Sequence, residues 1–326
     1  MTLEERLPKG AWVFLAPMAG VTDAPFRDLV GSFRATAMVS EMISSEALVR
    51  LNRRTYRRLV SKKENSLKII QLVGSNPKSM AESAIINEDL GADVVDINMG
   101  CPARKVTLNN SGAALMKNED LAVKIAESVV KSVKIPVTLK MRLGWDSTNI
   151  NCLSLAKKFE DAGISMLAIH CRTRAQMYSG KADWSVIREL RNIVKIPYLC
   201  NGDIKSPEDG VRALEESCAR GIMIGRAALG KPWLPNQIIQ FLNEKKIIPH
   251  PSIDQQFQII MAHFQAVLDF YGESHGIRLF RKHFAWYSSG LVGSSSFREV
   301  ISRAEDLSFI KSHVEEFYKK QIQKFY

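Results

Sequence analysis

Eight short apolar runs alternate with helix-like segments over roughly the first 230 residues of this 326-residue chain, and this alternation constrains the fold more than any other feature. The runs cover residues 12–16, 37–40, 67–73, 94–97, 135–142, 166–170, 196–200 and 221–224. Short apolar runs separated by helical patterns are typical of buried strands in a parallel sheet. Eight of them in this length predict an α/β fold, the (β/α)8 TIM barrel. The main alternative is a doubly wound sheet, but no G-x-G-x-x-G motif follows the first run.

A polar or small residue stands near the end of each run. These residues are Met18, Glu41, Gln71, Asn98, Lys140, His170, Asn201 and Gly225. The carboxyl ends of barrel strands converge on one mouth, so we expect these residues to line one pocket. The last two loops, Asn201-Gly202-Asp203 and Gly225-Arg226, occupy the place where such barrels bind a phosphate. Backbone N–H groups with one arginine suit a phosphate monoester.

A single cysteine, Cys101, stands on a sharp turn after the fourth run. Gly100 and Pro102 flank it, Asn98 precedes it and the cation Lys105 follows it. A lone cysteine is more often a buried structural thiol, but the glycine and proline beside this one favour an exposed turn. The nearby cations make a reactive or proton-donating thiol the better interpretation.

Two cations occupy the fifth run, at residues 135–142. Lys140 and Arg142 alternate with apolar neighbours, so both side chains point to the same face of the strand. A lysine within an apolar strand needs an anion or a developing negative charge nearby. We therefore predict that Lys140 belongs to a functional site.

The chain is basic, with a formal net charge of +11 and a pI of about 9.4. Such a charge can serve solubility alone, but a polyanionic partner, nucleic acid first, is the sharper interpretation. A basic run without acids covers residues 50–63 and would place a positive stripe on one helical face. A docking site and a solvated face explain this stripe equally well.

Cysteine usage and hydropathy bear on the compartment. Five cysteines with scattered spacing and no C-x-x-C pair argue against a zinc site and fit a reducing cytosol. The charged N-terminus does not resemble a signal peptide, and no apolar run approaches the roughly 18 residues that span a bilayer. We expect a cytoplasmic, monomeric protein without a metal or a membrane partner.

The last part of the chain is helical. Helical patterns cover roughly residues 253–271, 277–289, 297–309 and 310–324, after a linker marked by Pro249 and Pro251. We therefore divide the chain into a barrel domain, residues 1–240, and a helical domain, residues 250–326. The second of these helices carries Arg278, Arg281 and Lys282, and we expect these cations to face outward while the aromatic residues between them enter the core.

Several motifs in a fixed order resemble one family, the tRNA-dihydrouridine synthases. They lie at residues 16–23, 96–102, 111–116, 140–142, 170–174, 201–203 and 225–226. The tail motif Arg281-Lys282-His283, with Trp286-Tyr287, is similar to the bacterial B-type branch. The resemblance implies an FMN-dependent enzyme that reduces uridines in tRNA to 5,6-dihydrouridine, with NADPH, or alternatively NADH, as the reductant.

The resemblance also implies which residues bind the cofactor. Pro17, Met18 and Ala19 would lie against the flavin ring, and Gln71 and Lys140 would bind its nitrogen and oxygen edge. The ribityl chain and phosphate would be bound by His170, Asn201, Gly202, Asp203, Gly225 and Arg226.

The substrate residues implied by the resemblance surround Cys101. Asn98, Lys105 and Arg142 would bind the target uridine and its neighbouring backbone. Beyond the resemblance, the distribution of cations leads us to expect further tRNA contacts from Arg174, Arg278, Arg281 and Lys282.

The chemistry gives Cys101 its implied role as general acid. Reduction of the uracil C5–C6 bond needs a hydride at C6, which FMN would supply after NADPH reduces it, and a proton at C5. A thiol with an ordinary pKa near 8.5 is protonated at neutral pH and can deliver that proton. The chain departs from the family pattern at Cys171, where glycine is commoner, and at Cys200, where a small apolar residue is usual. Both departures concern packing rather than chemistry.

Two other functions stay open at this point. An FMN barrel that reduces a free small molecule would share the phosphate loops and Lys140, but it would leave the helical domain unexplained. A non-catalytic tRNA-binding module would explain the charge, but it would leave Cys101 and the phosphate loops without a purpose.

Overall fold

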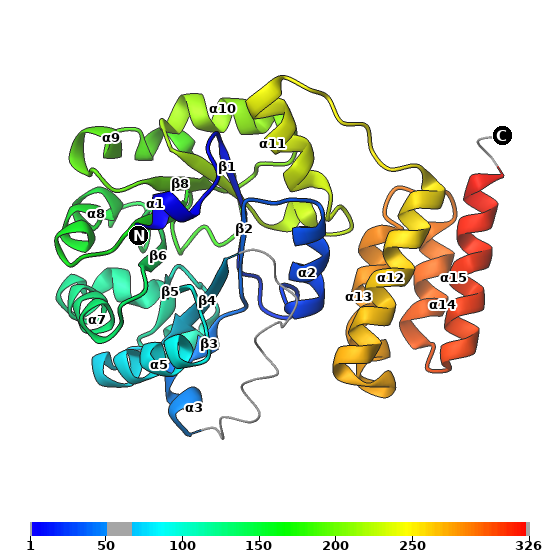
Figure 1. Cartoon of the computed structure of the whole chain (residues 1–326), viewed down its shortest axis with the longest axis horizontal. Helices are drawn as coiled ribbons and strands as arrows, with labels where there is room; N and C mark the ends of the chain where they lie inside the picture. Colours follow the sequence, from blue (N-terminus) through cyan, green and yellow to red (C-terminus); the bar gives the residue numbers. More distant parts are fainter. Residues whose placement is uncertain (1, 51–66, 324–326) are drawn as a thin grey trace.

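The strands form a closed parallel barrel, and four helices follow it (Figure 1). The computed structural model describes residues 2–50 and 67–323. Its strands are β1 (Trp12–Leu15), β2 (Ala37–Val39), β3 (Ile43–Ser44), β4 (Lys68–Val73), β5 (Val94–Met99), β6 (Val137–Arg142), β7 (Met166–His170), β8 (Tyr198–Asn201) and β9 (Gly221–Ile224). They pair in the order β2-β1-β9-β8-β7-β6-β5-β4-β3, and pairing between β2 and β4 closes a ring of eight. The predicted TIM barrel is confirmed.

One short strand was not expected from the sequence. Strand β3 pairs with the carboxyl end of β4, where Ile43 lies opposite Leu72 and Ser44 opposite Val73. Two residues are too few to give an alternating pattern, so periodicity cannot reveal such a strand. Beyond it the basic run at residues 50–63 lies outside the described residues, apart from Arg50 at the end of α3.

Helices cover the outside of the barrel. They are α2 (Ala24–Ser32), α3 (Ser45–Arg50), α5 (Pro77–Asp89), α7 (Glu119–Ser132), α8 (Cys152–Asp161), α9 (Leu190–Ile193), α10 (Pro207–Ser217) and α11 (Leu234–Glu244). Helix α7 shows the local logic, because Ala122, Ile125, Ala126 and Val129 recur at helical spacing and are buried against the sheet. No described helix is long and apolar enough to cross a membrane.

Two connections between strands contain 3-10 helices. The segment after Ser111 forms η1 (Gly112–Lys117), at whose start Gly112 has a φ of +60° and lies so close to Cys101 that a Cβ would approach the Cys101 carbonyl oxygen to 2.9 Å. After β7, a 3-10 turn η2 (Trp184–Ile187) precedes the short helix α9. Further short elements are α6 (Arg104–Thr107) and η3 (Arg226–Ala228).

The interior of the barrel is filled by side chains and closed at its amino end. Trp12, Phe14 and Met223 belong to this inner cluster, together with Leu3 and Leu7 from the first residues of the chain. The short helix α1 (Leu3–Arg6), capped by Thr2, brings these two leucines under the barrel. Among the described residues, this packing fills the amino end of the barrel, and the carboxyl ends of the strands are where such folds carry their sites.

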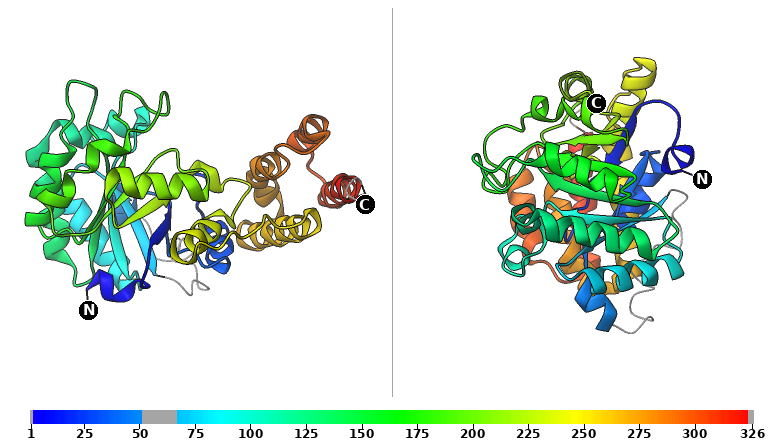
Figure 2. Two further views of the ribbon diagram at one scale, coloured as in Figure 1. Left: turned by 90° about the horizontal axis from the view of Figure 1, so that it is seen from above. Right: turned by 90° about the vertical axis from the view of Figure 1, so that its left-hand side faces the viewer.

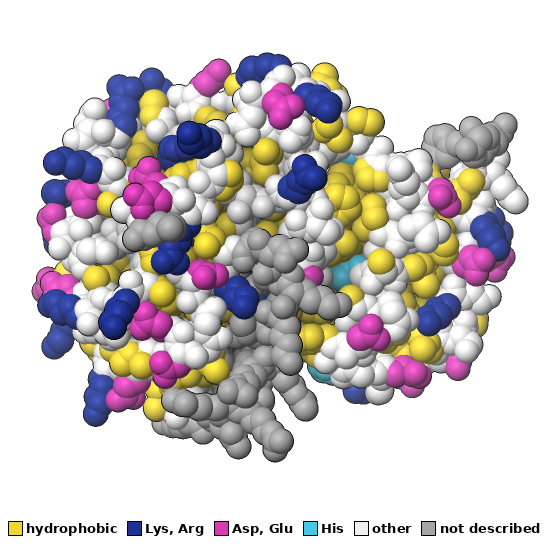
Figure 3. Space-filling view, in the orientation of Figure 1, with side chains coloured by type: hydrophobic (Ala, Val, Ile, Leu, Met, Phe, Trp, Pro, Cys, Tyr) yellow, Lys and Arg dark blue, Asp and Glu magenta, His cyan; other side chains and the backbone are white. Residues whose placement is uncertain are grey.

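The C-terminal helices are α12 (Ile253–Tyr271), α13 (Glu273–Tyr287), α14 (Ser294–Arg303) and α15 (Leu307–Ile322). They form a bundle with its own core around Phe264, Phe280 and Phe284, and the bundle extends from one side of the barrel (Figure 2). Helix α12 packs against α2, where the Phe26 ring lies 5.5 Å from that of His263. Hydrophobic and histidine side chains gather at this junction (Figure 3).

Candidate active site at the mouth of the barrel

The carboxyl ends of the strands line two adjoining cavities, of about 360 and 390 Å³. Both are lined by Pro17, Met18, Lys140, His170, Tyr178 and Arg226, so they form one continuous cleft. The first cavity adds Asn201, Gly202, Asp203 and Gly225; the second adds Ala19, Gln71, Asn98, Cys101 and Arg142. The structure therefore brings together all eleven residues expected at a cofactor, the expected acid Cys101, and two of the residues expected to bind the substrate, Asn98 and Arg142.

The first cavity is built to receive an anion. Arg172, which is buried, donates to Asp203 at 2.5 Å and to the Gly180 carbonyl at 2.7 Å. Burial alone would raise the pKa of Asp203, but the hydrogen bonds from Arg172 and the Ala182 N–H, with the positive charges nearby, together hold the pKa below its usual range. Arg226 lies 3.6 Å from the other oxygen of Asp203 and is 55% exposed, so its guanidinium retains N–H groups for a ligand.

Glycine shapes the backbone beside this anion site. Gly202 has a φ of +121°, and a Cβ there would come within 2.9 Å of the Ala182 Cβ and 3.0 Å of the His170 ring. Only glycine can adopt this conformation with its neighbours so close. Gly202 thus lines the first cavity without a side chain, which leaves its backbone accessible to a ligand.

A chain of hydrogen bonds runs beneath the second cavity. The carboxylate of Asp96 accepts from Thr138 at 2.6 Å and from the Gln71 amide at 2.6 Å. The Gln71 carbonyl accepts from Asn98 at 2.7 Å, and the Asn98 carbonyl accepts from the backbone N–H of Cys101 at 2.9 Å. These bonds fix the orientation of both amide side chains, and through Asn98 they hold the turn that carries the thiol.

Lys140 stands between the two cavities. Its ammonium donates to Asn201 at 3.2 Å. Burial, with the nearby charge of Arg142, lowers the pKa of Lys140 to about 8, although Asp96 opposes the shift. Burial, together with the positive charges of Lys140 and Arg142, lowers the pKa of His170 far below its usual range, so this imidazole is neutral. Lys140 therefore offers a positive charge that titrates near physiological pH.

Arg142 supports the loops around the thiol. Its side chain is buried and donates to the carbonyls of Gly100 at 2.7 Å, and of Thr173 and Met177 at 2.9 Å each. The contact with a substrate that we expect from Arg142 remains a prediction, because these bonds are to backbone groups of two loops.

Cys101 is the cysteine that lines the cleft. Its residue is partly exposed, whereas Cys152, Cys171 and Cys200 are buried. Cys171 and Cys200 lie with their sulfur atoms 3.7 Å apart behind the strand ends. A thiol on a supported turn, open to a cavity and near two cations, is placed to transfer a proton to a bound molecule.

The outlying cations are arranged differently from the expectation. Lys105 is exposed on α6, and the Arg174 guanidinium lies 4.5 Å from the centre of the Trp145 ring. Of the three cations on α13, only Arg278 is exposed. Arg281 donates to the Ala304 carbonyl at 2.7 Å, and Lys282 donates to the Gly20 carbonyl of the barrel. The expectation that all three face outward was wrong, because two of them bind backbone carbonyls of this chain.

Sequence reasoning missed three residues of this site. Asp96 and Arg172 lie within the motifs but were given no role, and Tyr178 was not noticed. Tyr178 lines both cavities, 4.7 Å from the Arg226 guanidinium and 5.8 Å from that of Arg142. A carboxylate inside the apolar run at residues 94–97 was the available signal for Asp96, because a buried charge needs partners.

A cleft at the carboxyl ends of the strands, with arginines at one end and a thiol at the other, places this chain in the class of TIM-barrel proteins that carry their sites at the barrel mouth. Two solved structures share the fold. A histamine dehydrogenase from Rhizobium sp. 4-9 is 12% identical, with a TM-score of 0.56 over 95% of this chain and 62% of that one. A morphinone reductase mutant in complex with tetrahydroNAD is 13% identical, with a TM-score of 0.52 over 74% of this chain and 89% of that one.

Sequence comparison defines the family more narrowly. The family model described as dihydrouridine synthase matches residues 14–323. A protein of Rickettsia bellii named probable tRNA-dihydrouridine synthase is 47% identical over 313 residues, 96% of each chain. The tRNA-dihydrouridine synthase B of Pseudomonas syringae pv. tomato is 42% identical over 306 residues, 94% of this chain and 91% of that protein. This chain belongs to the dihydrouridine synthase family.

Proposed function

We propose that this protein reduces uridines in tRNA to 5,6-dihydrouridine, with FMN as its cofactor and NADPH as the reductant. The observation that carries the proposal is the single cleft with an anion site at one end and Cys101 at the other. Membership of the dihydrouridine synthase family supports it, because the named relatives are tRNA-dihydrouridine synthases. A tRNA substrate would place the activity in the cytoplasm.

The residues of the first cavity suit the phosphate and ribityl chain of FMN. Arg226 keeps free N–H groups, and the backbone at Gly202 approaches closely because no side chain intervenes. His170 and Asn201 would bind the ribityl hydroxyls, and the loops at Asp203 and Gly225 would enclose the phosphate. An arginine with backbone N–H groups is the usual recognition of a phosphate dianion.

The residues of the second cavity, several of which also line the first, suit a flat polar ring. Pro17, Met18 and Ala19 would contact its face, and Gln71 and Lys140 would bind its heteroatom edge. These residues would hold FMN, which, once reduced by NADPH, would supply the hydride for uracil C6. Lys140 would place a buried positive charge beside that ring, where it would stabilise developing negative charge.

Cys101 would supply the other hydrogen. Its thiol would give a proton to uracil C5, and the thiolate left behind would face the cations Lys140 and Arg142, on whose pKa values Cys101 already acts. Asn98 and Arg142 hold the turn from below and would orient the base. The base must leave its stack to enter this cleft.

The tRNA outside the cleft would be bound by cations around the mouth and on the bundle. Lys105, Arg174 and Arg278 remain candidates for phosphate contacts, and the helical domain at residues 250–326 would carry the last of them. Arg281 and Lys282 are engaged with the carbonyls of Ala304 and Gly20, so we no longer assign them to tRNA.

The test is to map dihydrouridine in tRNA from cells that lack this protein. The proposal predicts that defined positions lose the modification and regain it when the gene is restored. Purified protein that reduces free uridine as readily as tRNA would instead favour a small-molecule reductase. A protein that binds tRNA but carries no flavin would favour a binding module.

A further inference from the structure

The bundle contacts the barrel at the loop that follows β1. The Lys282 ammonium donates to the Gly20 carbonyl, and the Gly20 N–H donates to the carboxylate of Glu41. The backbone of Gly20 is thus held on both sides, by α13 and by the loop after β2. Gly20 has a φ of +75°, and a Cβ there would lie 3.3 Å from the Lys282 ammonium, so this lysine packs directly on the loop.

This loop is the one that lines the cleft. Pro17, Met18 and Ala19 face the second cavity. Within the loop, the Val21 and Thr22 N–H groups donate to the Met18 carbonyl at 2.9 and 3.0 Å, and the Met18 N–H donates to the Thr22 hydroxyl at 2.8 Å. Because the loop is a closed turn around Met18, a movement at Gly20 would also displace Met18.

A second bundle residue lies near the other end of the turn. Tyr271 at the end of α12 lines the same small cavity as Asp23, whose carboxylate caps α2 by accepting from the Phe26 N–H at 3.0 Å. Asp23, Glu41, Tyr271 and Lys282 line one small cavity of about 180 Å³ between barrel and bundle. Lys282 therefore shares this cavity with two carboxylates, and its ammonium donates to the Gly20 carbonyl.

We propose that Lys282 is a positioning residue, through which the helical bundle holds the loop at residues 17–23 in the shape that binds the flavin ring. The identity of the ligand, FMN, rests on the proposed function. The restraint that Lys282 places on the loop does not depend on it. Lys282 then acts on the cofactor from the second domain without touching it.

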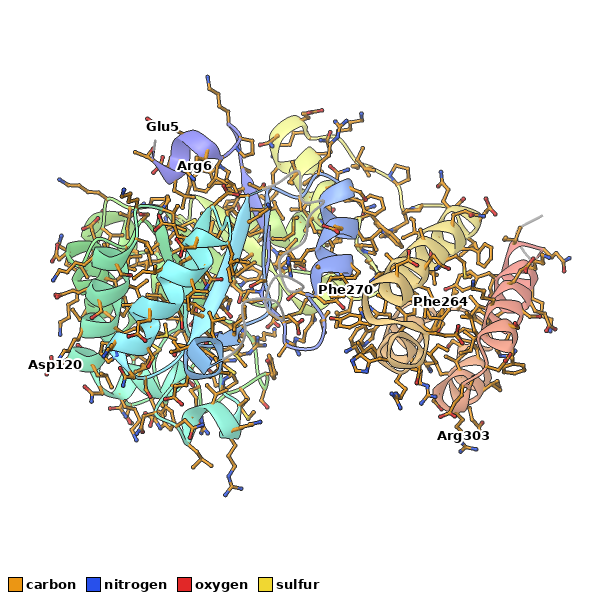
Figure 4. All side chains as sticks on the ribbon, turned by 60° about the horizontal axis from the view of Figure 1, so that its bottom comes forward. Glu5, Arg6, Asp120, Phe264, Phe270 and Arg303 are labelled. Carbon is orange, nitrogen blue, oxygen red and sulfur yellow. The ribbon has the colours of Figure 1, made fainter. Side chains whose placement is uncertain are left out.

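The experiment compares Lys282→Met with a matched control, Arg303→Met. The first change removes the ammonium and keeps an unbranched stem of similar length. The second removes an exposed cation of the same bundle on the side away from the barrel (Figure 4). Two quantities are measured on the full chain: hydrogen exchange of the peptide containing residues 17–23 without FMN, and the dissociation constant for FMN by fluorescence titration. Thermal unfolding confirms that each variant is folded.

A charge-assisted hydrogen bond of ordinary strength predicts about tenfold faster exchange of this peptide in Lys282→Met. The dissociation constant for FMN should rise about three- to tenfold by the same reasoning, because binding must then re-form the turn. NADPH oxidation should return to the wild-type rate at saturating FMN. Lys282→Arg, which keeps a charged donor, should restore both quantities, and Arg303→Met should change neither.

The inference would be overturned if Lys282→Met showed the same hydrogen exchange and the same FMN affinity as Arg303→Met. A change in only one of the two would also overturn it, because the coupling between loop and ligand would be missing. If the wild-type protein binds no FMN, the proposed function fails on its own, and the exchange measurement still decides whether Lys282 holds the loop.

Discussion

At the residue scale, the cleft depends on one buried carboxylate. Asp96 receives hydrogen bonds from Thr138 and Gln71, and burial raises its pKa because the charged form loses water. Its charge also supports the positive form of Lys140, which burial disfavours. Asp96 thus partly offsets the effect of burial and of Arg142 on the pKa of Lys140, and a bound anion would raise that pKa further.

The pKa of Lys140, about 8, predicts a pH dependence of cofactor binding. Below this pH the lysine is protonated and attracts the flavin; above it the free protein loses that charge. Because FMN is anionic, its dissociation constant should be flat between about pH 7 and 8 and rise at higher pH. Fluorescence titration across this range measures it.

The control for this prediction is Lys140→Met, which removes the titrating group and keeps the apolar stem. Its affinity for FMN should be weaker than that of the wild-type protein and should not change between about pH 7 and 9. An identical rise in both proteins would assign the pH dependence to another group.

At the element scale, the loops after the strands carry the residues of the site, and the hydrogen-bonded strands fix the position at which each loop begins. Sequence periodicity predicted the eight strands of the ring, since each is a buried apolar run with a clear end. It could not predict β3, which is too short, or the interruption between η2 and α9. Loop geometry at Gly112 and Gly202 depends on atoms distant in sequence, so only the structure shows why these positions require glycine.

Gly202→Ala tests the loop that we propose to face the phosphate. A methyl group would meet Ala182 and His170 in a backbone conformation with φ of +121°, so the variant should lose about 2 to 4 kcal/mol of unfolding free energy. Flavin affinity should fall with it. Denaturant unfolding and flavin titration provide the measurements.

Gly91→Ala is the matched control for this loop. Gly91 also has a positive φ, +86°, but a Cβ there would have nothing within 4 Å. Gly91→Ala should lower the free energy of unfolding by only about 1 kcal/mol, which is the cost of placing alanine at a positive φ without any clash. Equal losses in the two variants would mean that the contacts around Gly202 do not matter.

At the scale of the whole molecule, the bundle is joined to the barrel through α2 and the loop before it. The sequence predicted four helices here, but some of their bounds were wrong. Helix α13 begins at Glu273 rather than near residue 277, α14 covers Ser294–Arg303 rather than 297–309, and α15 begins at Leu307. The sequence could not predict the direction of Lys282, because that depends on how the bundle docks. The bundle has one face against the loop at residues 17–23, through Lys282, and another face that is exposed and carries Arg278.

The exposed face predicts a salt dependence of tRNA binding. Arg278→Ala should weaken binding and lower the slope of log affinity against log salt concentration by about 1, if Arg278 contacts one phosphate. Arg281→Ala should leave the slope unchanged, since Arg281 binds the Ala304 carbonyl. Filter binding at several salt concentrations measures both, and equal slopes for wild-type protein and Arg278→Ala would place tRNA elsewhere.

The central claim joins flavin reduction to proton transfer from Cys101. Its most direct test is the dihydrouridine content of unmodified tRNA after incubation with FMN, NADPH and either wild-type protein or Cys101→Ala. We predict that Cys101→Ala keeps FMN binding and NADPH oxidation but forms dihydrouridine roughly 10² to 10⁴ times more slowly, the usual contribution of a general acid. Dihydrouridine formed by Cys101→Ala at the wild-type rate would contradict the claim.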